Sequence, residues 1–227
     1  MTFALLSSRP WNSETTARLN AKDLGPFILI SDKSELTITK LMNQNIEKIF
    51  VAHWSSIIEP EVFNSFEVII FHMTDLPFGR GGSPLQNLIV RGIKSTKITA
   101  LRCTSVLDGG PIYLKEQLSL NGSAEEIYIR ADLIIEKMIA TILLVKPEPI
   151  EQVGEPVVFQ RRKNSDSKIP RGLSGEKLYD FIRMLDAPGY PHAFLTIEQT
   201  NYIFTQATYI DGVLNARIEV VDSQKIE

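Results

Sequence analysis

The chain has 227 residues, of which 44% are hydrophobic, and its formal net charge is −3. These values predict one main globular domain with a small appendage, and the lack of a basic excess argues against a nucleic-acid partner. The single cysteine, Cys103, excludes an internal disulfide, and no apolar run is long enough to span a bilayer, so we expect an unprocessed cytoplasmic protein without membrane contact.

Short apolar runs alternate with amphipathic or polar segments in the first part of the chain. Strands are predicted at residues 2–7, 26–30, 46–53 and 67–71, and helices at 12–24, 34–43 and 59–66. This alternation is typical of a doubly wound, Rossmann-like α/β fold with a mostly parallel sheet. Because no Gly-x-Gly-x-x-Gly pattern follows the first strand, an ordinary dinucleotide site is not expected.

A histidine follows the fourth predicted strand and opens a loop rich in glycine and proline, from His72 to Gln86. A further predicted strand at residues 98–104 leads into Asp108. If neighbouring parallel strands end side by side, His72 and Asp108 converge at one edge of the sheet, where a carboxylate would orient the imidazole and raise its basicity. The alternative is that His72 only caps a strand and that Asp108 is an ordinary turn residue.

Together these two motifs resemble the folate-dependent formyltransferase family, which includes methionyl-tRNA formyltransferase and the nucleotide-sugar N-formyltransferases. The residues that carry the resemblance are His72, Leu76, Pro77, Arg80, Gly81, Pro84, Gln86, Leu107, Asp108 and Gly109. The resemblance covers roughly residues 45 to 195 and implies transfer of a formyl group from 10-formyltetrahydrofolate to a primary amine. Where the family has an asparagine two residues before the histidine, this chain has Ile70, so another group must hold the oxyanion.

The resemblance also implies roles for individual residues, with His72 as the general base oriented by Asp108. The residues expected to contact the folate, partly through their main chain, are Trp54, Ser56, Ile58, Arg80 and Leu107. Those expected to contact the acceptor are Thr74, Arg161, Arg162 and Tyr190. Arg80 and the cluster Arg161 to Lys163 are also compatible with solvated cations, and Tyr190 with simple packing. No metal ligands are expected.

The second half of the sequence continues the pattern and then changes character. A helix is predicted at 123–142, with a capping box formed by Ser123 and Glu126, and a proline-rich linker at 146–156. A short helix around 178–185 and strands at 193–197, 202–209 and 213–221 follow, with a hairpin turn at Asp211 and Gly212. We therefore predict a catalytic domain at residues 1–145 and a small α+β subdomain at 146–227, for acceptor binding or dimerisation.

The expected function is formyl transfer to the amine of a nucleotide-linked amino sugar. The most specific candidate is a UDP-4-amino-4,6-dideoxy sugar, by resemblance to the formyltransferase of pseudaminic acid biosynthesis. The alternatives are a glycinamide ribonucleotide or aminoacyl-tRNA acceptor, and a protein that binds folate or a nucleotide sugar without turnover. A homodimer through the C-terminal strands is also expected, because pairing would cover their exposed edge.

Overall fold

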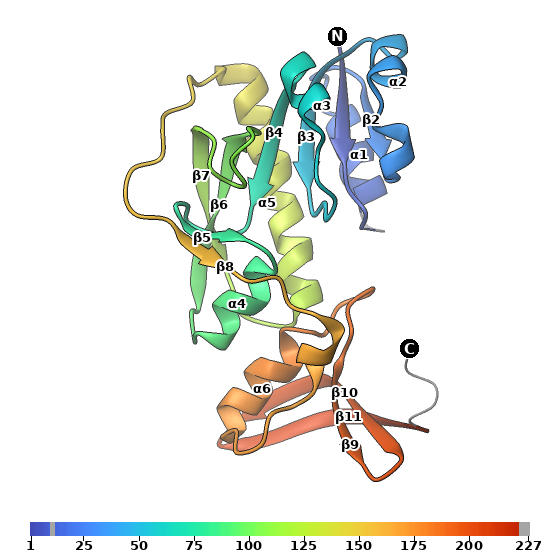
Figure 1. Ribbon diagram of the computed structural model, residues 1–227, viewed down its shortest axis with the longest axis vertical. Coiled ribbons are helices and arrows are strands. Elements are labelled where there is room, and N and C mark those ends of the chain that lie inside the picture. The colour runs from blue at the N-terminus through green and yellow to red at the C-terminus, as the bar shows by residue number, and fades with distance from the viewer. Residues whose placement is uncertain (10–11, 223–227) are drawn as a thin grey trace. The chain divides into compact units, whose positions relative to one another are not determined.

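The computed structural model describes residues 1–9 and 12–222 (Figure 1). Contacts between residues divide the chain into two compact units that are interleaved along the sequence. Unit 1 comprises Met1–Gly81, Thr96–Leu118 and Ile129–Val158. Unit 2 comprises Gly82–Ser95, Ser119–Tyr128 and the described residues from Phe159 onward. The contacts group residues 146–158 with unit 1, whereas the sequence placed a domain boundary after residue 145. That boundary stays a prediction.

Most of a six-stranded sheet lies in unit 1, with the strand order β2-β1-β3-β4-β6-β7. Its strands are β1 (Thr2–Leu6), β2 (Phe27–Ile30), β3 (Ile46–Ala52), β4 (Glu67–His72), β6 (Ser95–Arg102) and β7 (Ile112–Ser119). The neighbours among β2, β1, β3 and β4 pair in parallel, whereas β6 pairs with β4 in the antiparallel direction. This mostly parallel α/β sheet confirms the predicted fold class.

Helices accompany the sheet of unit 1 (Figure 1). They are α1 (Asn12–Asn20), the 3-10 turn η1 (Lys33–Glu35), α2 (Ile38–Asn43), α3 (Pro60–Ser65) and residues 129–145 of α5 (Ala124–Val145). Successive residues of β1 point to opposite faces of the sheet. Ala4 joins the core cluster that contains Leu41 of α2 and Val62 of α3, while the Phe3 ring lies 5.2 Å from that of Phe27. The apolar run of β1, whose side chains point to the two faces in turn, therefore contributes to a core on each face.

Two short strands, β5 (Phe78–Gly81) and β8 (Val157–Phe159), form a separate pair that the sequence did not predict. The sequence of β5 is Phe-Gly-Arg-Gly, and glycine has a low strand propensity. Next to this pair, the Val157 amide donates to the Pro77 carbonyl over 3.2 Å. Tertiary pairing, rather than local propensity, therefore makes this strand.

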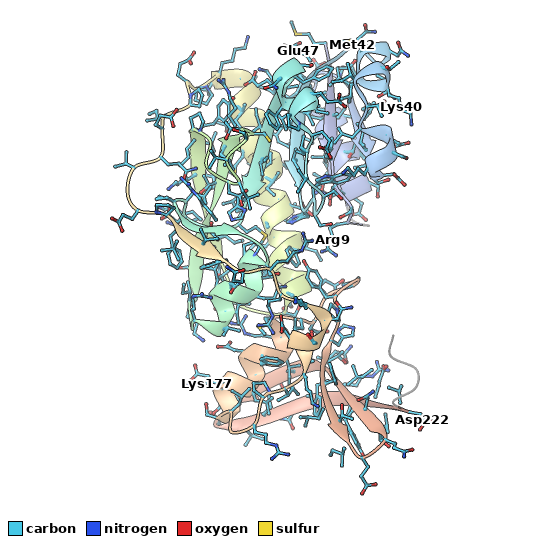
Figure 2. All side chains as sticks on the ribbon, in the orientation of Figure 1. Arg9, Lys40, Met42, Glu47, Lys177 and Asp222 are labelled. Carbon is cyan, nitrogen blue, oxygen red and sulfur yellow. The ribbon has the colours of Figure 1, made fainter. Side chains whose placement is uncertain are left out.

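A three-stranded antiparallel sheet and short helices build unit 2. Its elements are α4 (Pro84–Val90), η2 (Asn164–Ser167), α6 (Gly175–Arg183), β9 (Ala193–Ile197), β10 (Thr200–Ile210) and β11 (Val213–Asp222). The Tyr179 ring of α6 stacks on Tyr209 of β10, with centroids 6.2 Å apart, and Lys177 is exposed on the same helix (Figure 2). Asp211 and Gly212 have φ values of 51° and 80°, which confirms the predicted hairpin turn.

A buried arginine anchors α6 within unit 2. The side chain of Arg183 is 4% exposed, and its Nε donates to Asp180 Oδ1 over 2.7 Å. Its Nη1 donates to the carbonyls of Leu120 and Gly122 over 2.6 and 2.8 Å. The cation is thus bound by a carboxylate and two backbone carbonyls. None of the helices in the described parts of the chain is long and apolar enough to cross a membrane.

Candidate functional site

His72 is the last residue of β4, and its side chain is 8% exposed. Its Nε2 lies 2.7 Å from the carbonyl oxygen of Gly79. Because a carbonyl only accepts hydrogen bonds, Nε2 carries the hydrogen of the neutral ring. Nδ1 is therefore the nitrogen that can take up a proton. The Thr74 hydroxyl donates to the same carbonyl over 3.3 Å. Gly79 therefore fixes both the orientation and the tautomer of His72.

Asp108 places its carboxylate on the other side of the imidazole. Its Oδ2 lies 3.6 Å from His72 Nδ1, which is too long for a hydrogen bond but short enough for a strong charge interaction once Nδ1 is protonated. The same oxygen accepts the Gly81 amide over 2.8 Å. The predicted pair is thus brought together, although Gly79, and not Asp108, makes the hydrogen bond that orients the ring.

The route by which Asp108 reaches His72 differs from the prediction. We expected parallel strands ending at one edge, but β6 runs against β4 and pairs Arg102 with Ile69. The loop after β6 must therefore turn back, and it does so at Asp108, whose φ is 49°. At Gly110 a Cβ atom would lie 1.9 Å from the Arg102 carbonyl, so only glycine fits this close approach.

Gln152 completes this part of unit 1. Its Oε1 accepts from Arg80 Nε and Nη2 over 3.2 and 2.7 Å. Its Nε2 donates to the carbonyls of Asp108 and Gly110 over 2.9 and 2.8 Å. Arg80 is therefore joined to the loop that carries Asp108. Sequence reasoning missed Gln152, because a glutamine within a proline-rich stretch gives no local signal of a distant partner.

The predicted folate contacts within unit 1 differ in accessibility. Ser56 is exposed, Leu107 is 69% exposed and Ile58 is buried. Trp54 is half-buried, and its Nε1 has no hydrogen-bond partner among the described residues. Thr74 is fully buried, and its hydroxyl donates to the Gly79 carbonyl. The contacts of these residues to folate or acceptor stay predictions.

His53 follows β3 and belongs to a buried polar network. Its Nε2 lies 3.1 Å from Asp132 Oδ1, which also accepts from Asn12 Nδ2 over 3.2 Å. The Ser7 hydroxyl donates to Asn12 Oδ1 over 2.6 Å. Asn12 opens α1 and Asp132 lies in α5, so the network ties both helices to the ends of β1 and β3. His53 therefore has a structural role.

Cys103 begins the loop that leads to Asp108 and is half-buried. Burial, with a smaller contribution from the Asp108 charge, raises the pKa of its thiol to about 11. The thiol is therefore protonated near neutral pH and is a poor nucleophile. A cavity of about 410 Å³ lies beside it, lined by Pro60, Phe63, Asn64, Cys103, Thr104 and Ser105. None of these residues was predicted to bind a substrate.

The remaining predicted residues belong to unit 2. Arg162 is half-buried: its amide donates to Ser83 Oγ over 3.0 Å, and its guanidinium lies over Phe181, 5.6 Å from the ring centroid. Burial lowers the pKa of this guanidinium. Arg161 packs against Gly82, where an added Cβ would lie 2.5 Å from the arginine Cβ. This close approach and the Ser83 hydrogen bond hold the basic segment in place.

Tyr190 is stacked on Tyr128, with ring centroids 5.5 Å apart, and the two hydroxyl oxygens lie 2.5 Å apart. The ring therefore has an aromatic partner within unit 2, in line with the packing alternative. Its contact to the acceptor stays a prediction. In residues 1–9 and 12–222, no group of three or more His, Cys, Asp and Glu side chains is placed to hold a metal ion.

Comparisons with known proteins connect the whole chain to one family. A family model described as the C-terminal domain of methionyl-tRNA formyltransferase matches residues 164–221. The solved structure of methionyl-tRNA formyltransferase from Clostridium thermocellum is 43% identical, with a TM-score of 0.94, and the match covers 98% of this chain and 99% of that one. The methionyl-tRNA formyltransferase of Thermodesulfovibrio yellowstonii is 30% identical over 186 residues, which are 77% of this chain but 59% of that protein. The chain thus spans about three fifths of this curated relative.

Similarity to a sugar-modifying enzyme is weaker. The formyltransferase PseJ from Anoxybacillus kamchatkensis, solved with tetrahydrofolate and UDP-4,6-dideoxy-4-formamido-L-AltNAc, is 20% identical with a TM-score of 0.58, which shows a shared fold alone. The higher identity to methionyl-tRNA formyltransferases overturns two expectations from the sequence, namely an amino-sugar acceptor and the absence of a nucleic-acid partner. The chain belongs to the formyltransferase family that includes the methionyl-tRNA formyltransferases.

Proposed function

We propose that the protein transfers a formyl group from 10-formyltetrahydrofolate to the amino group of an aminoacyl-tRNA. The observation that carries this proposal is the 43% identity to the Clostridium thermocellum methionyl-tRNA formyltransferase along almost the full length of both chains. The match of residues 164–221 to the C-terminal domain of such enzymes adds support.

The geometry around His72 suits this reaction. The neutral amine attacks the formyl carbon, and the developing ammonium loses a proton to His72 Nδ1. The imidazolium is then stabilised by the Asp108 carboxylate, 3.6 Å away. As the bond between the formyl carbon and N10 of the folate breaks, the imidazolium returns the proton to N10. Ile70 offers no hydrogen-bond donor, so other groups must stabilise the oxyanion.

A local concentration of basic residues explains why the net charge of the whole chain was a poor guide to a nucleic-acid partner. The segment 159–171 of unit 2 has one acidic residue, Asp166, while the whole chain carries −3. Its basic residues are Arg161, Arg162, Lys163, Lys168 and Arg171. All of them except Arg162 are exposed. Because affinity for nucleic acid depends on the cations near the phosphates, a basic segment can act within an acidic protein.

The direct test is an assay with purified protein, 10-formyltetrahydrofolate and methionyl-tRNA. We expect formyl-methionyl-tRNA to form together with an equal amount of tetrahydrofolate. Deacylated tRNA, which lacks the amine, and free methionine, which lacks the RNA, are the matched controls and should give no product. If methionyl-tRNA and other aminoacyl-tRNAs remain unformylated under conditions where the folate binds, the proposed acceptor is wrong.

Replacing Lys163 by alanine tests whether this residue of the segment 159–171 contacts the RNA. We expect weaker binding of methionyl-tRNA and a slope of log affinity against log salt concentration that is shallower by about one, since one phosphate contact is lost. The matched control is Lys177→Ala, because Lys177 is also an exposed lysine of unit 2 but lies on α6. Equal salt slopes for the two variants would show that Lys163 does not contact the phosphates.

A further inference from the structure

The segment at residues 150–157 of unit 1, here called the return segment, is not the free linker that its prolines suggested. Ile150 forms a two-way bridge with Ile112, with N to O distances of 2.8 and 2.9 Å. At the other end, the Val157 amide donates to the Pro77 carbonyl over 3.2 Å. The return segment is thus attached at both ends, and Gln152 lies between these attachments.

The hydrogen-bonding capacity of the Gln152 amide is fully used. A primary amide has two donor hydrogens and an oxygen with two lone pairs. Here both hydrogens go to carbonyls of the turn, at Asp108 and Gly110, and both lone pairs go to Arg80. No other neutral side chain of this length can donate twice and accept twice. The arrangement therefore depends on glutamine at this position.

The bond to the Asp108 carbonyl is important because of the backbone conformation there. Asp108 has a φ of 49°, in the left-handed region, which is unfavourable for a non-glycine residue. Such a conformation persists only where its surroundings hold it. Gln152 contacts the carbonyl of this very residue, while the Asp108 side chain lies beside His72.

We propose that Gln152 is a positioning residue for catalysis: it holds the turn at Asp108 so that the carboxylate stays next to His72 Nδ1. The proposal rests on the formyl transfer proposed above. A glutamine that only stabilised the fold would, when removed, lower the free energy of unfolding and leave kcat of the folded protein unchanged. A positioning residue lowers kcat at a temperature where the variant is fully folded.

The kinetic test is a double-mutant cycle with Gln152→Ala and Asp108→Ala. Gln152→Ala alone should lower kcat about 10- to 100-fold, because small displacements of catalytic groups have effects of this size, with a smaller change in KM for the aminoacyl-tRNA. In the Asp108→Ala background the same substitution should lower kcat less than about twofold, since the group it positions is gone. Fully multiplicative effects would overturn the proposal. Gln117→Ala, at an exposed glutamine on β7, is the matched control.

The conservative variant Gln152→Glu separates the two halves of the contact. A carboxylate still accepts from Arg80 but presents oxygens to the carbonyls of Asp108 and Gly110, so the turn is repelled instead of held. We expect kcat to fall at least as far as in Gln152→Ala. Wild-type kcat in this variant would show that the donation to the turn is not needed and would overturn the proposal.

Amide hydrogen exchange gives a readout that does not depend on the reaction. The Gly81 amide is protected by its bond to Asp108 Oδ2, and we expect it to lose that protection in Gln152→Ala while the strands of the sheet keep theirs. Unchanged protection at Gly81 would overturn the positioning role. A wild-type protein that formylates no aminoacyl-tRNA, but shows this loss on substitution, would refute the proposed function and leave the positioning of Asp108 standing.

Discussion

Replacing His72 by alanine is expected to lower kcat/KM for formyl transfer about 10²- to 10⁴-fold, the usual contribution of a positioned general base. The Nε2 hydrogen of His72 is committed to the Gly79 carbonyl, 2.7 Å away, so in the proposed mechanism Nδ1 is the atom that receives the proton of the attacking amine. Alanine removes this acceptor and leaves the amine proton to solvent. The measurement is single-turnover formyl transfer, which isolates the chemical step from product release.

Two further substitutions make this test specific. His72→Gln can still donate to the Gly79 carbonyl but cannot take up a proton, so it should keep folate binding and lose activity as severely as alanine. His192→Ala removes a half-buried histidine of unit 2, whose Nδ1 lies 3.9 Å from Asp186, and should leave the rate unchanged. A His72→Gln enzyme with a rate near that of the wild type would exclude the histidine as the base.

Replacing Arg183 by alanine should reduce the free energy of unfolding by about 3 to 5 kcal/mol, the usual result of breaking a buried ion pair by removing one partner. The substitution leaves the buried Asp180 carboxylate with Lys94, whose Nζ is 3.5 Å away, as its ion-pair partner. It also leaves the carbonyls of Leu120 and Gly122 without their donor. Urea unfolding, with the slope compared between variants, measures the loss.

The matched control is Arg217→Ala, because Arg217 also forms an ion pair, with Glu219 at 3.0 Å, but its side chain is 60% exposed. Exposed pairs contribute about 0 to 1 kcal/mol, so this variant should unfold almost as the wild type does. If Arg183→Ala were no more destabilising than Arg217→Ala, the buried arginine would not be the anchor of α6 that its contacts indicate.

Much of the fold follows from patterns confined to short segments. The alternation of apolar runs and helices predicted β1 to β4 in order, because burying these runs requires a sheet covered on both faces. The capping box was also predictable: the Glu126 carboxylate accepts from the Ser123 amide at 2.8 Å, and the Ser123 hydroxyl accepts from the Glu126 amide at 3.3 Å. The pairing of His72 with Asp108 was expected on two grounds: parallel strands that end side by side, a premise that the antiparallel β6 contradicts, and the resemblance to a family, which does not depend on strand direction.

The predictions that failed required information that a local sequence pattern does not contain. An apolar run has the same period in both directions, so the sequence did not show that β6 runs antiparallel to β4. The contacts of Gln152 join residues more than 40 positions apart along the chain, and nothing beside it in the sequence marks them. The proposed acceptor was not expected from the sequence because net charge averages over the chain, whereas a phosphate responds to nearby cations.

The position of the return segment also determines how this protein can be recombined with its relatives. By sequence it adjoins the C-terminal half, but by its contacts it belongs to unit 1. In a chimaera joined after residue 145, the residue at position 152 would come from the relative, whereas the turn at Asp108 would come from this protein. A junction after Val158 would leave that turn with its own partner. An exchange of the C-terminal residues by grafting should therefore begin at the later position.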